Sequence, residues 1–100
     1  MRKLEIESLE ELEAIFREKT VDMTDNIREG IEEAMKNKKK TAILFEIFMD
    51  GMDTSFEISL ASKEWITALE NCLKHYGEWE MSDEAIDTYL LIKELKSKKL

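Results

Sequence analysis

The stretch that organises this chain is residues 8–36, which read SLEELEAIFREKTVDMTDNIREGIEEAMK. Apolar residues recur there at every third or fourth position, and at about 100° per residue they fall on one side of a helix. We therefore predict one long amphipathic helix. Its apolar face consists of Leu9, Leu12, Phe16, Thr20, Met23, Ile27, Ile31 and Ala34. Its opposite face carries the acids Glu7, Glu11, Glu18, Asp22, Asp25, Glu29 and Glu32.

The two ends and the middle of this helix differ in how well the sequence defines them. Ser8 and Glu11 have the spacing of a capping box, in which side chains satisfy the first free amide groups of a helix. Residues 19–24 are the weak point, because two threonines and a valine there lower the helix propensity. The alternative is a break in this segment, with Asp22 or Thr24 capping a second helix.

Residues 41–60 indicate two strands joined by a tight turn. The first half, residues 41–49, is apolar at almost every position, and the second alternates apolar and polar residues. Turn residues lie between the two halves, as in an antiparallel hairpin. Residues 2–7 also alternate, so they can add a third strand. The long helix then packs on a small antiparallel sheet.

Two positions in these elements raise questions of packing. Gly30 falls on the apolar side of the long helix, where a missing Cβ either lets a strand approach closely or is simply tolerated. The strand at residues 41–49 is apolar on both faces, so Leu44 and Phe48 need cover on the second one. A second copy of the chain, paired through this strand or through the long helix, would supply that cover.

The last part of the chain predicts a helical hairpin. Ser62 precedes a helix from about Lys63 to Tyr76, and Gly77 stands where a left-handed residue ends a helix. Ser82 caps the final helix. The buried side of that helix is expected to consist of Ala85, Ile86, Tyr89, Leu90, the stem of Lys93, and Leu95. The element order β-α-β-β-α-α predicts a single α+β domain over residues 1–100.

Composition limits the classes of function. The net charge is −8 over 100 residues, which disfavours direct binding to nucleic acid or to anionic membranes and favours a basic partner. No apolar run is long enough to span a membrane, and the N-terminus has no apolar signal core. The single cysteine fits a reducing compartment. We therefore expect a cytoplasmic protein.

Constellations that carry catalysis or bind metal are not recognisable in the sequence. Cys72 and His75 are three residues apart, but a zinc site needs more ligands, and there is no second cysteine or histidine. No nucleophile–base pattern and no phosphate-binding glycine loop is present. We therefore expect a protein that is not an enzyme and that holds no cofactor or metal.

Two acidic segments are candidates for binding a partner protein. On the predicted helix, Glu18, Asp22, Asp25, Glu29 and Glu32 follow one another at about 5–6 Å, close to the spacing of phosphates along a nucleic-acid strand. The second segment joins the last two helices and contains Glu78, Trp79, Glu80, Met81, Asp83, Glu84 and Asp87. Tryptophan is frequent at the energetic centres of interfaces. The plain alternatives are a solvated helix face and a large side chain that fills the base of the hairpin.

Two resemblances follow from these features. Residues 69–95, with Leu73, Ala85, Ile92 and Leu95 in place, resemble the helical-hairpin interaction motif of bacterial excision-repair proteins. Glu80 and Ser82 stand where that motif prefers apolar residues, so only the hairpin shape carries over. In size, acidity and element order the chain is similar to small phage-encoded anti-CRISPR inhibitors, which occupy the DNA-binding site of a nuclease. This resemblance implies that the residues answering to their acidic stretch are Glu78, Glu80, Asp83, Glu84 and Asp87.

The sequence thus favours a small acidic, non-enzymatic protein that binds and inhibits a basic nuclease or regulator, in its sharpest form as a nucleic-acid mimic of phage type. The alternative is a homo-oligomeric or adaptor domain. A small enzyme completed by a partner chain has the least support.

Overall fold

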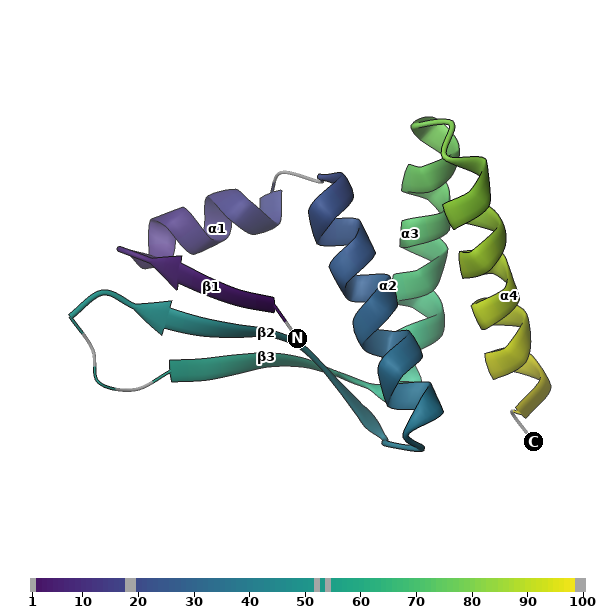
Figure 1. Cartoon of the computed structure of the whole chain (residues 1–100), viewed down its shortest axis with the longest axis horizontal. Coiled ribbons are helices and arrows are strands. Elements are labelled where there is room, and N and C mark those ends of the chain that lie inside the picture. Colours follow the sequence, from purple (N-terminus) through teal and green to yellow (C-terminus); the bar gives the residue numbers. More distant parts are fainter. Residues whose placement is uncertain (1, 18–19, 52, 54, 99–100) are drawn as a thin grey trace.

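A computed structural model describes residues 2–17, 20–51, 53 and 55–98 of the chain. The fold is of the α+β class, as the sequence predicted (Figure 1). In order, the elements are β1 (Arg2–Ile6), α1 (Leu9–Arg17), α2 (Val21–Lys36), β2 (Thr41–Met49), β3 (Ser55–Ala61), a short 3-10 turn (Ser62–Glu64), α3 (Trp65–Glu78) and α4 (Ser82–Lys98).

The prediction of one long helix is wrong, because α1 and α2 are separate and run in different directions (Figure 1). The alternative of a break in residues 19–24 is confirmed, since α2 begins at Val21, but its cap is Thr20 and not Asp22 or Thr24. Thr20 has an extended backbone, and its hydroxyl accepts a hydrogen bond of 3.1 Å from the amide of Met23. A threonine that satisfies a free amide in this way starts a new helix instead of continuing the old one.

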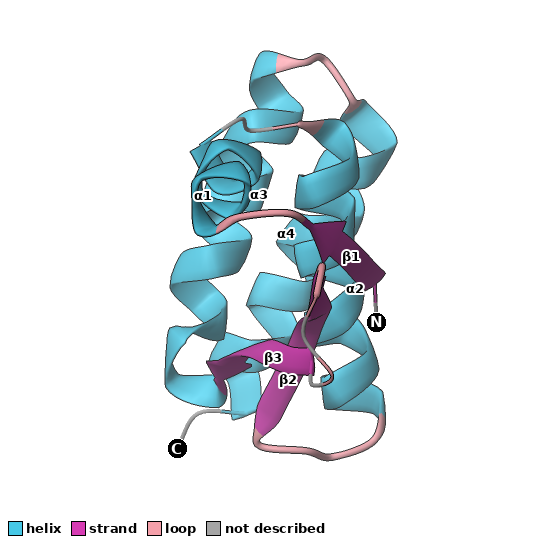
Figure 2. Cartoon of the chain, turned by 90° about the vertical axis from the view of Figure 1, so that its left-hand side faces the viewer, coloured by secondary structure: helices cyan, strands magenta, loops and turns pink. Residues whose placement is uncertain are grey.

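The sheet is mixed, with strand order β1-β2-β3. β2 and β3 form the predicted antiparallel hairpin, whereas β1 pairs with β2 in parallel, so the expectation of a wholly antiparallel sheet is wrong. A parallel neighbour needs a long connection that returns the chain to the same end of the sheet. α1 and α2 supply that connection, and α1 lies beside β1 in both views (Figures 1 and 2).

A bulge in β2 changes which side chains face the helices. The register shifts between Ile43 and Phe45, and Leu44 and Phe45 are both buried while Ile43 is exposed. The predicted alternation therefore fails at this point. The helix α2 holds the bulge closely: Asn26 Nδ2 donates a hydrogen bond to the Leu44 carbonyl, and a Cβ added at Gly30 would lie 2.8 Å from Leu44 Cδ2. Close approach is thus the reason for glycine at this position.

The core lies between the sheet and the helices, and its buried side chains form one cluster that includes Ile31, Ile47 and Leu69. α3 packs on α2, and α4 packs on α3 to form the predicted helical hairpin (Figure 1). α3 begins at Trp65, after the 3-10 turn, so Ser62 does not occupy the predicted cap position.

The buried side of α4 differs from the prediction. Thr88, Leu91 and Ile92 are buried against the rest of the protein, whereas Ile86, Tyr89 and Leu90 are exposed. The Thr88 hydroxyl donates to the carbonyl of Glu84 at 2.7 Å, and this bond lets a polar residue take a buried position. Apolar residues lie around most of this helix, so their period alone does not identify the buried face.

Candidate partner-binding surface

The turn between α3 and α4 is fixed by its backbone. The amide of Met81 donates a hydrogen bond to the carbonyl of Tyr76 at 2.9 Å, and the amide of Glu80 donates one to the carbonyl of Gly77 at 3.2 Å. These two bonds form a Schellman motif, in which the residue after the C-cap is left-handed. Glu80 takes that conformation, with φ of 57°. The prediction that Gly77 ends the helix is therefore wrong, since α3 continues through it to Glu78.

Trp79 packs this turn against the end of α3. Its ring stacks on His75, with centroids 5.6 Å apart, and meets the Tyr76 ring edge-on at 6.3 Å. The side chain is half-buried, so Trp79 lies between the two predicted roles of an exposed interface residue and a buried plug. His75 Nδ1 also lies 4.0 Å from the carboxylate of Glu78. The aromatic contacts hold the turn against the end of α3.

The structure brings the second predicted acidic segment together at one end of the molecule, where α3 passes into α4 (Figure 1). We call its exposed carboxylates, Glu78, Glu80, Asp83 and Asp87, the acidic corner. Glu84 and Met81 belong to the same segment but are half-buried. Four residues within ten positions of one helical hairpin thus place negative charges at this end of the molecule.

The first predicted acidic segment does not form a continuous stripe. Asp25 is half-buried and accepts a hydrogen bond from the Tyr76 hydroxyl, which in turn accepts one of 3.2 Å from Arg28 Nε. Arg28 Nη2 lies 3.9 Å from the same carboxylate, and its guanidinium lies over the Tyr76 ring. Burial raises the pKa of the Tyr76 phenol, and the hydrogen bond to Asp25 raises it further. Asp25 therefore joins α2 to α3 and is not a free surface charge.

The other acids of this segment have different surroundings. Glu18 lies outside the described residues, Asp22 and Glu29 are exposed, and Glu32 is half-buried. Because the chain changes direction between α1 and α2, the regular phosphate-like spacing extends only along α2. This geometry makes the acidic corner the better candidate for a contact with a partner.

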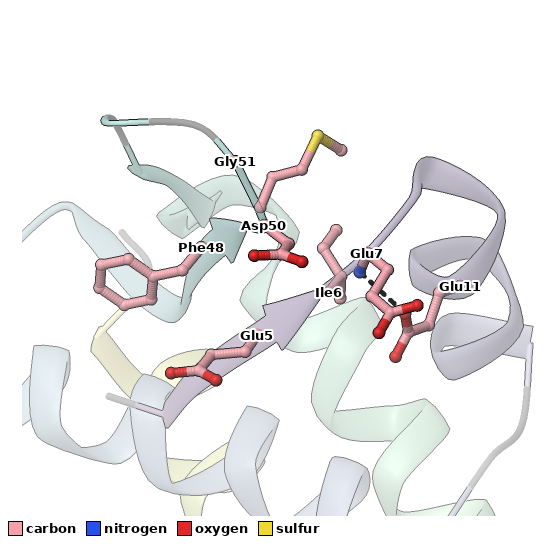
Figure 3. A pocket seen from close by; sticks show the side chains of 8 residues that line it. Glu5, Ile6, Glu7, Glu11, Phe48, Asp50 and Gly51 are labelled. Carbon is pink, nitrogen blue, oxygen red and sulfur yellow. Dashed lines mark hydrogen bonds between the residues drawn. The ribbon is translucent and has the colours of Figure 1, made fainter.

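A third acidic surface was not recognised in the sequence. An open hollow of about 490 Å³ lies where β1 meets α1 and the turn after β2, and four carboxylates line it: Glu5, Glu7, Glu11 and Asp50 (Figure 3). Glu11 is fixed by the capping box, since its amide lies 3.3 Å from Ser8 Oγ and its carboxylate accepts from the Glu7 amide at 2.9 Å. The predicted box therefore forms, with its second bond moved by one residue. The parallel pairing of β1, which the sequence did not reveal, creates this hollow.

The surroundings of Cys72 and His75 indicate a structural role for both side chains. Cys72 is buried, and its thiol lies 3.8 Å from the carbonyl of Thr24 on α2. Burial raises the pKa of this thiol to about 11, so it stays protonated near neutral pH. In the parts of the chain that the structure describes, no group of three histidine, cysteine, aspartate or glutamate side chains is arranged so that it could hold a metal ion.

Comparison with protein-family models, curated proteins and solved structures gives no match to this chain. Within the described residues, no helix has the length and apolar character needed to cross a membrane.

Proposed function

We propose that this chain is a cytoplasmic, non-enzymatic inhibitor that binds a basic protein through the acidic corner. The observation that carries the proposal is the fixed backbone that holds two of these charges, Glu78 and Glu80. Glu78 and Glu80 are exposed, yet their backbone is held by the Schellman motif and by Trp79. Groups that are already ordered lose little conformational freedom on binding, so more of their interaction energy appears as affinity.

The sign of the surface indicates the kind of partner. A net charge of −8 attracts a basic surface at long range and speeds its association. A site that binds nucleic acid is a basic surface of this kind, because phosphates are bound mainly by lysine and arginine. In its sharpest form, we propose that the chain is a phage-type, anti-defence mimic that competes with nucleic acid for a nuclease or regulator.

The alternative of a homo-oligomer paired through β2 has less support. It was motivated by apolar side chains on the second face of that strand, but Leu44 is only 6% exposed, since the bulge turns it under α2. Phe48 is half-buried. Neither of the two side chains that motivated this alternative is therefore left fully exposed for a second copy to cover.

A matched pair of charge reversals tests the proposal. The corner variant is Glu78→Lys with Glu80→Lys, and the control is Glu33→Lys with Glu70→Lys, which are also exposed. Each reversal adds two charges, so both variants change from −8 to −4. The corner variant should keep its fold, because cations near the end of α3 complement the helix dipole.

The assay is affinity capture from the lysate of the cell in which the protein occurs, with bound proteins identified by mass spectrometry. We expect the original chain and the control to retain a basic nucleic-acid-binding protein at low salt. High salt, added DNA or the corner variant should each release it, since exposed charges are screened. Equal capture by the corner variant and the control would refute the proposed role of the corner.

A further inference from the structure

β3 forms one edge of the sheet, and within the described residues it packs chiefly on β2 (Figure 1). The strand extends over seven residues. Its sequence, SFEISLA, contains none of the prolines or lysines with which proteins usually protect an edge strand. The opposite edge differs, because β1 is shorter, carries Lys3 and lies beside α1. β3 is therefore the edge that can accept another strand.

The backbone groups that face outward from β3 follow from its pairing with β2. The amide of Ser62 donates a hydrogen bond of 2.9 Å to the carbonyl of Lys40. Thr41 and Ala61, which lie between these two residues, are therefore paired without hydrogen bonds to each other. In such a pair, the N–H and C=O groups of each residue point away from the other strand. Because this direction alternates along a strand, the residues of β3 with outward-facing backbone groups are Ser55, Glu57, Ser59 and Ala61.

The sequence of β3 fits a second copy of itself in one register. Two copies that pair antiparallel about Ile58 bring outward-facing residues opposite one another along all seven positions. Glu57 then lies opposite Ser59 of the second copy, and Phe56 lies opposite Leu60 of the second copy. A shift by two residues in either direction shortens the pairing, and one of these shifts places Glu57 opposite Glu57, where like charges repel. A shift by one residue sets outward-facing backbone groups against inward-facing ones.

Side chains in this register complement one another. Phe56 is paired with the buried Ile47 of β2, on the side of the sheet that faces the core, yet it is 39% exposed. Leu60 of a second copy would lie beside it and continue the apolar layer. Beyond the strands, the register brings Asp53 of one copy toward Lys63 of the other, since each lies two residues from an end of β3. Both are exposed, so an acid meets a base at each end of the pairing.

We propose that two copies of this chain pair antiparallel through β3 and join their three-stranded sheets into one. The same surface is used on both copies, so the assembly closes as a twofold dimer. The acidic corner lies at the turn between α3 and α4, away from β3 (Figure 1). The dimer therefore leaves one acidic corner accessible on each copy. This inference goes beyond the proposed function and does not depend on it.

Opposite charges placed at residue 59 test the register. In Ser59→Lys each new ammonium group faces Glu57 of the other copy, whereas in Ser59→Glu two carboxylates face each other. We expect Ser59→Lys to lower the dissociation constant of the dimer, and Ser59→Glu to raise it, each by about threefold to tenfold, because the cross-strand pair occurs twice. Sedimentation equilibrium of the full chain measures this constant, and circular dichroism verifies that each variant is folded.

The matched controls are Asn71→Lys and Asn71→Glu, at an exposed position of α3. They change the net charge by the same amounts as the variants of Ser59, but they lie outside the pairing. We expect them to change the dissociation constant by less than about twofold, because distant exposed charges are screened at physiological salt.

Cysteine cross-linking locates the contact. In a Cys72→Ala background, Glu57→Cys chains are mixed with Ser59→Cys chains under mild oxidation. The mixed disulfide joins residues that lie directly opposite each other. Two identical cysteines would be diagonal neighbours, which are too far apart for an ordinary disulfide. We expect the mixed dimer to predominate over both identical dimers when the products are quantified by mass spectrometry.

Three results would overturn the inference: a chain that stays monomeric at its highest soluble concentration, equal responses of the dimer to the variants of Ser59 and of Asn71, or equal yields of mixed and identical disulfides. A monomeric chain that captures another protein, and loses it in both Ser59 variants, would show that a foreign strand pairs with β3. The corner variant, Glu78→Lys with Glu80→Lys, should dimerise as the original chain does. Its loss of partner capture tests the proposed function separately.

Discussion

The hydroxyl of Tyr76 on α3 donates a hydrogen bond to the carboxylate of Asp25 on α2, across 51 residues of sequence. Arg28 donates to the same hydroxyl, so three polar groups satisfy one another at the contact between the two helices. α3 carries the acidic corner at its end, and α2 packs on β2. This contact therefore helps to fix the corner relative to the sheet.

Tyr76→Phe should destabilise the protein by about 1–2 kcal/mol, because a half-buried carboxylate and guanidinium lose a hydrogen-bond partner. Tyr89→Phe is the matched control, since its hydroxyl belongs to an exposed side chain; it should change the stability by less than about 0.5 kcal/mol. Urea denaturation followed by circular dichroism measures both. Equal effects of the two variants would contradict an energetic role for the Tyr76 hydrogen bonds.

Glu80→Gly should stabilise the protein by about 1 kcal/mol, because a residue with a Cβ is strained in the left-handed region. Lys38→Gly should act similarly, since Lys38 has φ of 55° in the same motif at the end of α2. Glu70→Gly, inside α3, should instead cost about 1 kcal/mol. Thermal unfolding compares the three. A loss of stability in Glu80→Gly would show that its side chain makes a compensating contact. If the corner binds a partner, the same variant should bind more weakly although it is more stable.

Gly30→Ala should not give the gain of about 1 kcal/mol that alanine brings elsewhere in helices, because the new Cβ would lie 2.8 Å from Leu44 Cδ2. In a Leu44→Val background that atom is absent, and the gain should reappear. A double-mutant cycle measured by urea denaturation gives the coupling directly. Additive effects of the two substitutions would show that the close contact does not determine the need for glycine.

Stability should fall as the pH rises above 9. The Cys72 thiol ionises near 9.0 in the unfolded chain and near 11 in the folded one, so the folded state binds more protons between these values. The loss reaches about 2–3 kcal/mol at most, at roughly 1.4 kcal/mol per pH unit of difference. Cys72→Ala should unfold with a smaller slope between pH 9 and 10. The native thiol should also react slowly with a thiol reagent at pH 8, and quickly in urea. Fast reaction without urea would contradict its burial.

The sequence was a good guide wherever a signal is local and unambiguous. The alternation of residues 54–60 and the turn before them were sufficient for the β2–β3 hairpin, and the spacing of Ser8 and Glu11 was sufficient for the start of α1. Near Thr20 the sequence marked a weak segment but favoured one helix, because a continuous apolar phase does not reveal a change in helix direction. The prediction of the buried side of α4 was wrong because apolar residues lie on several sides of this helix. Packing against the neighbouring helix therefore decides which side is buried.

The candidate surface, too, could be predicted only in part from the sequence. That residues 78–87 are acidic follows from the sequence, whereas which of these carboxylates are free does not. Asp25 and Glu78 belong to equally acidic segments, yet one is held by Tyr76 and the other is exposed. The difference depends on which residue of a distant helix reaches each carboxylate.

The sequence alone determined the composition and the negative charge, which are sums over its residues. It also determined the α+β class and the amphipathic faces of α2 and β3, because these properties depend on neighbours within a few residues. Tertiary structure alone decided the parallel pairing of β1, the bulge beneath Gly30, the partner of Asp25 and the exposure of Ile86, Tyr89 and Leu90. Each of these depends on contacts between segments far apart in sequence. Their energies are set by the shape of the assembled core, which no local period encodes.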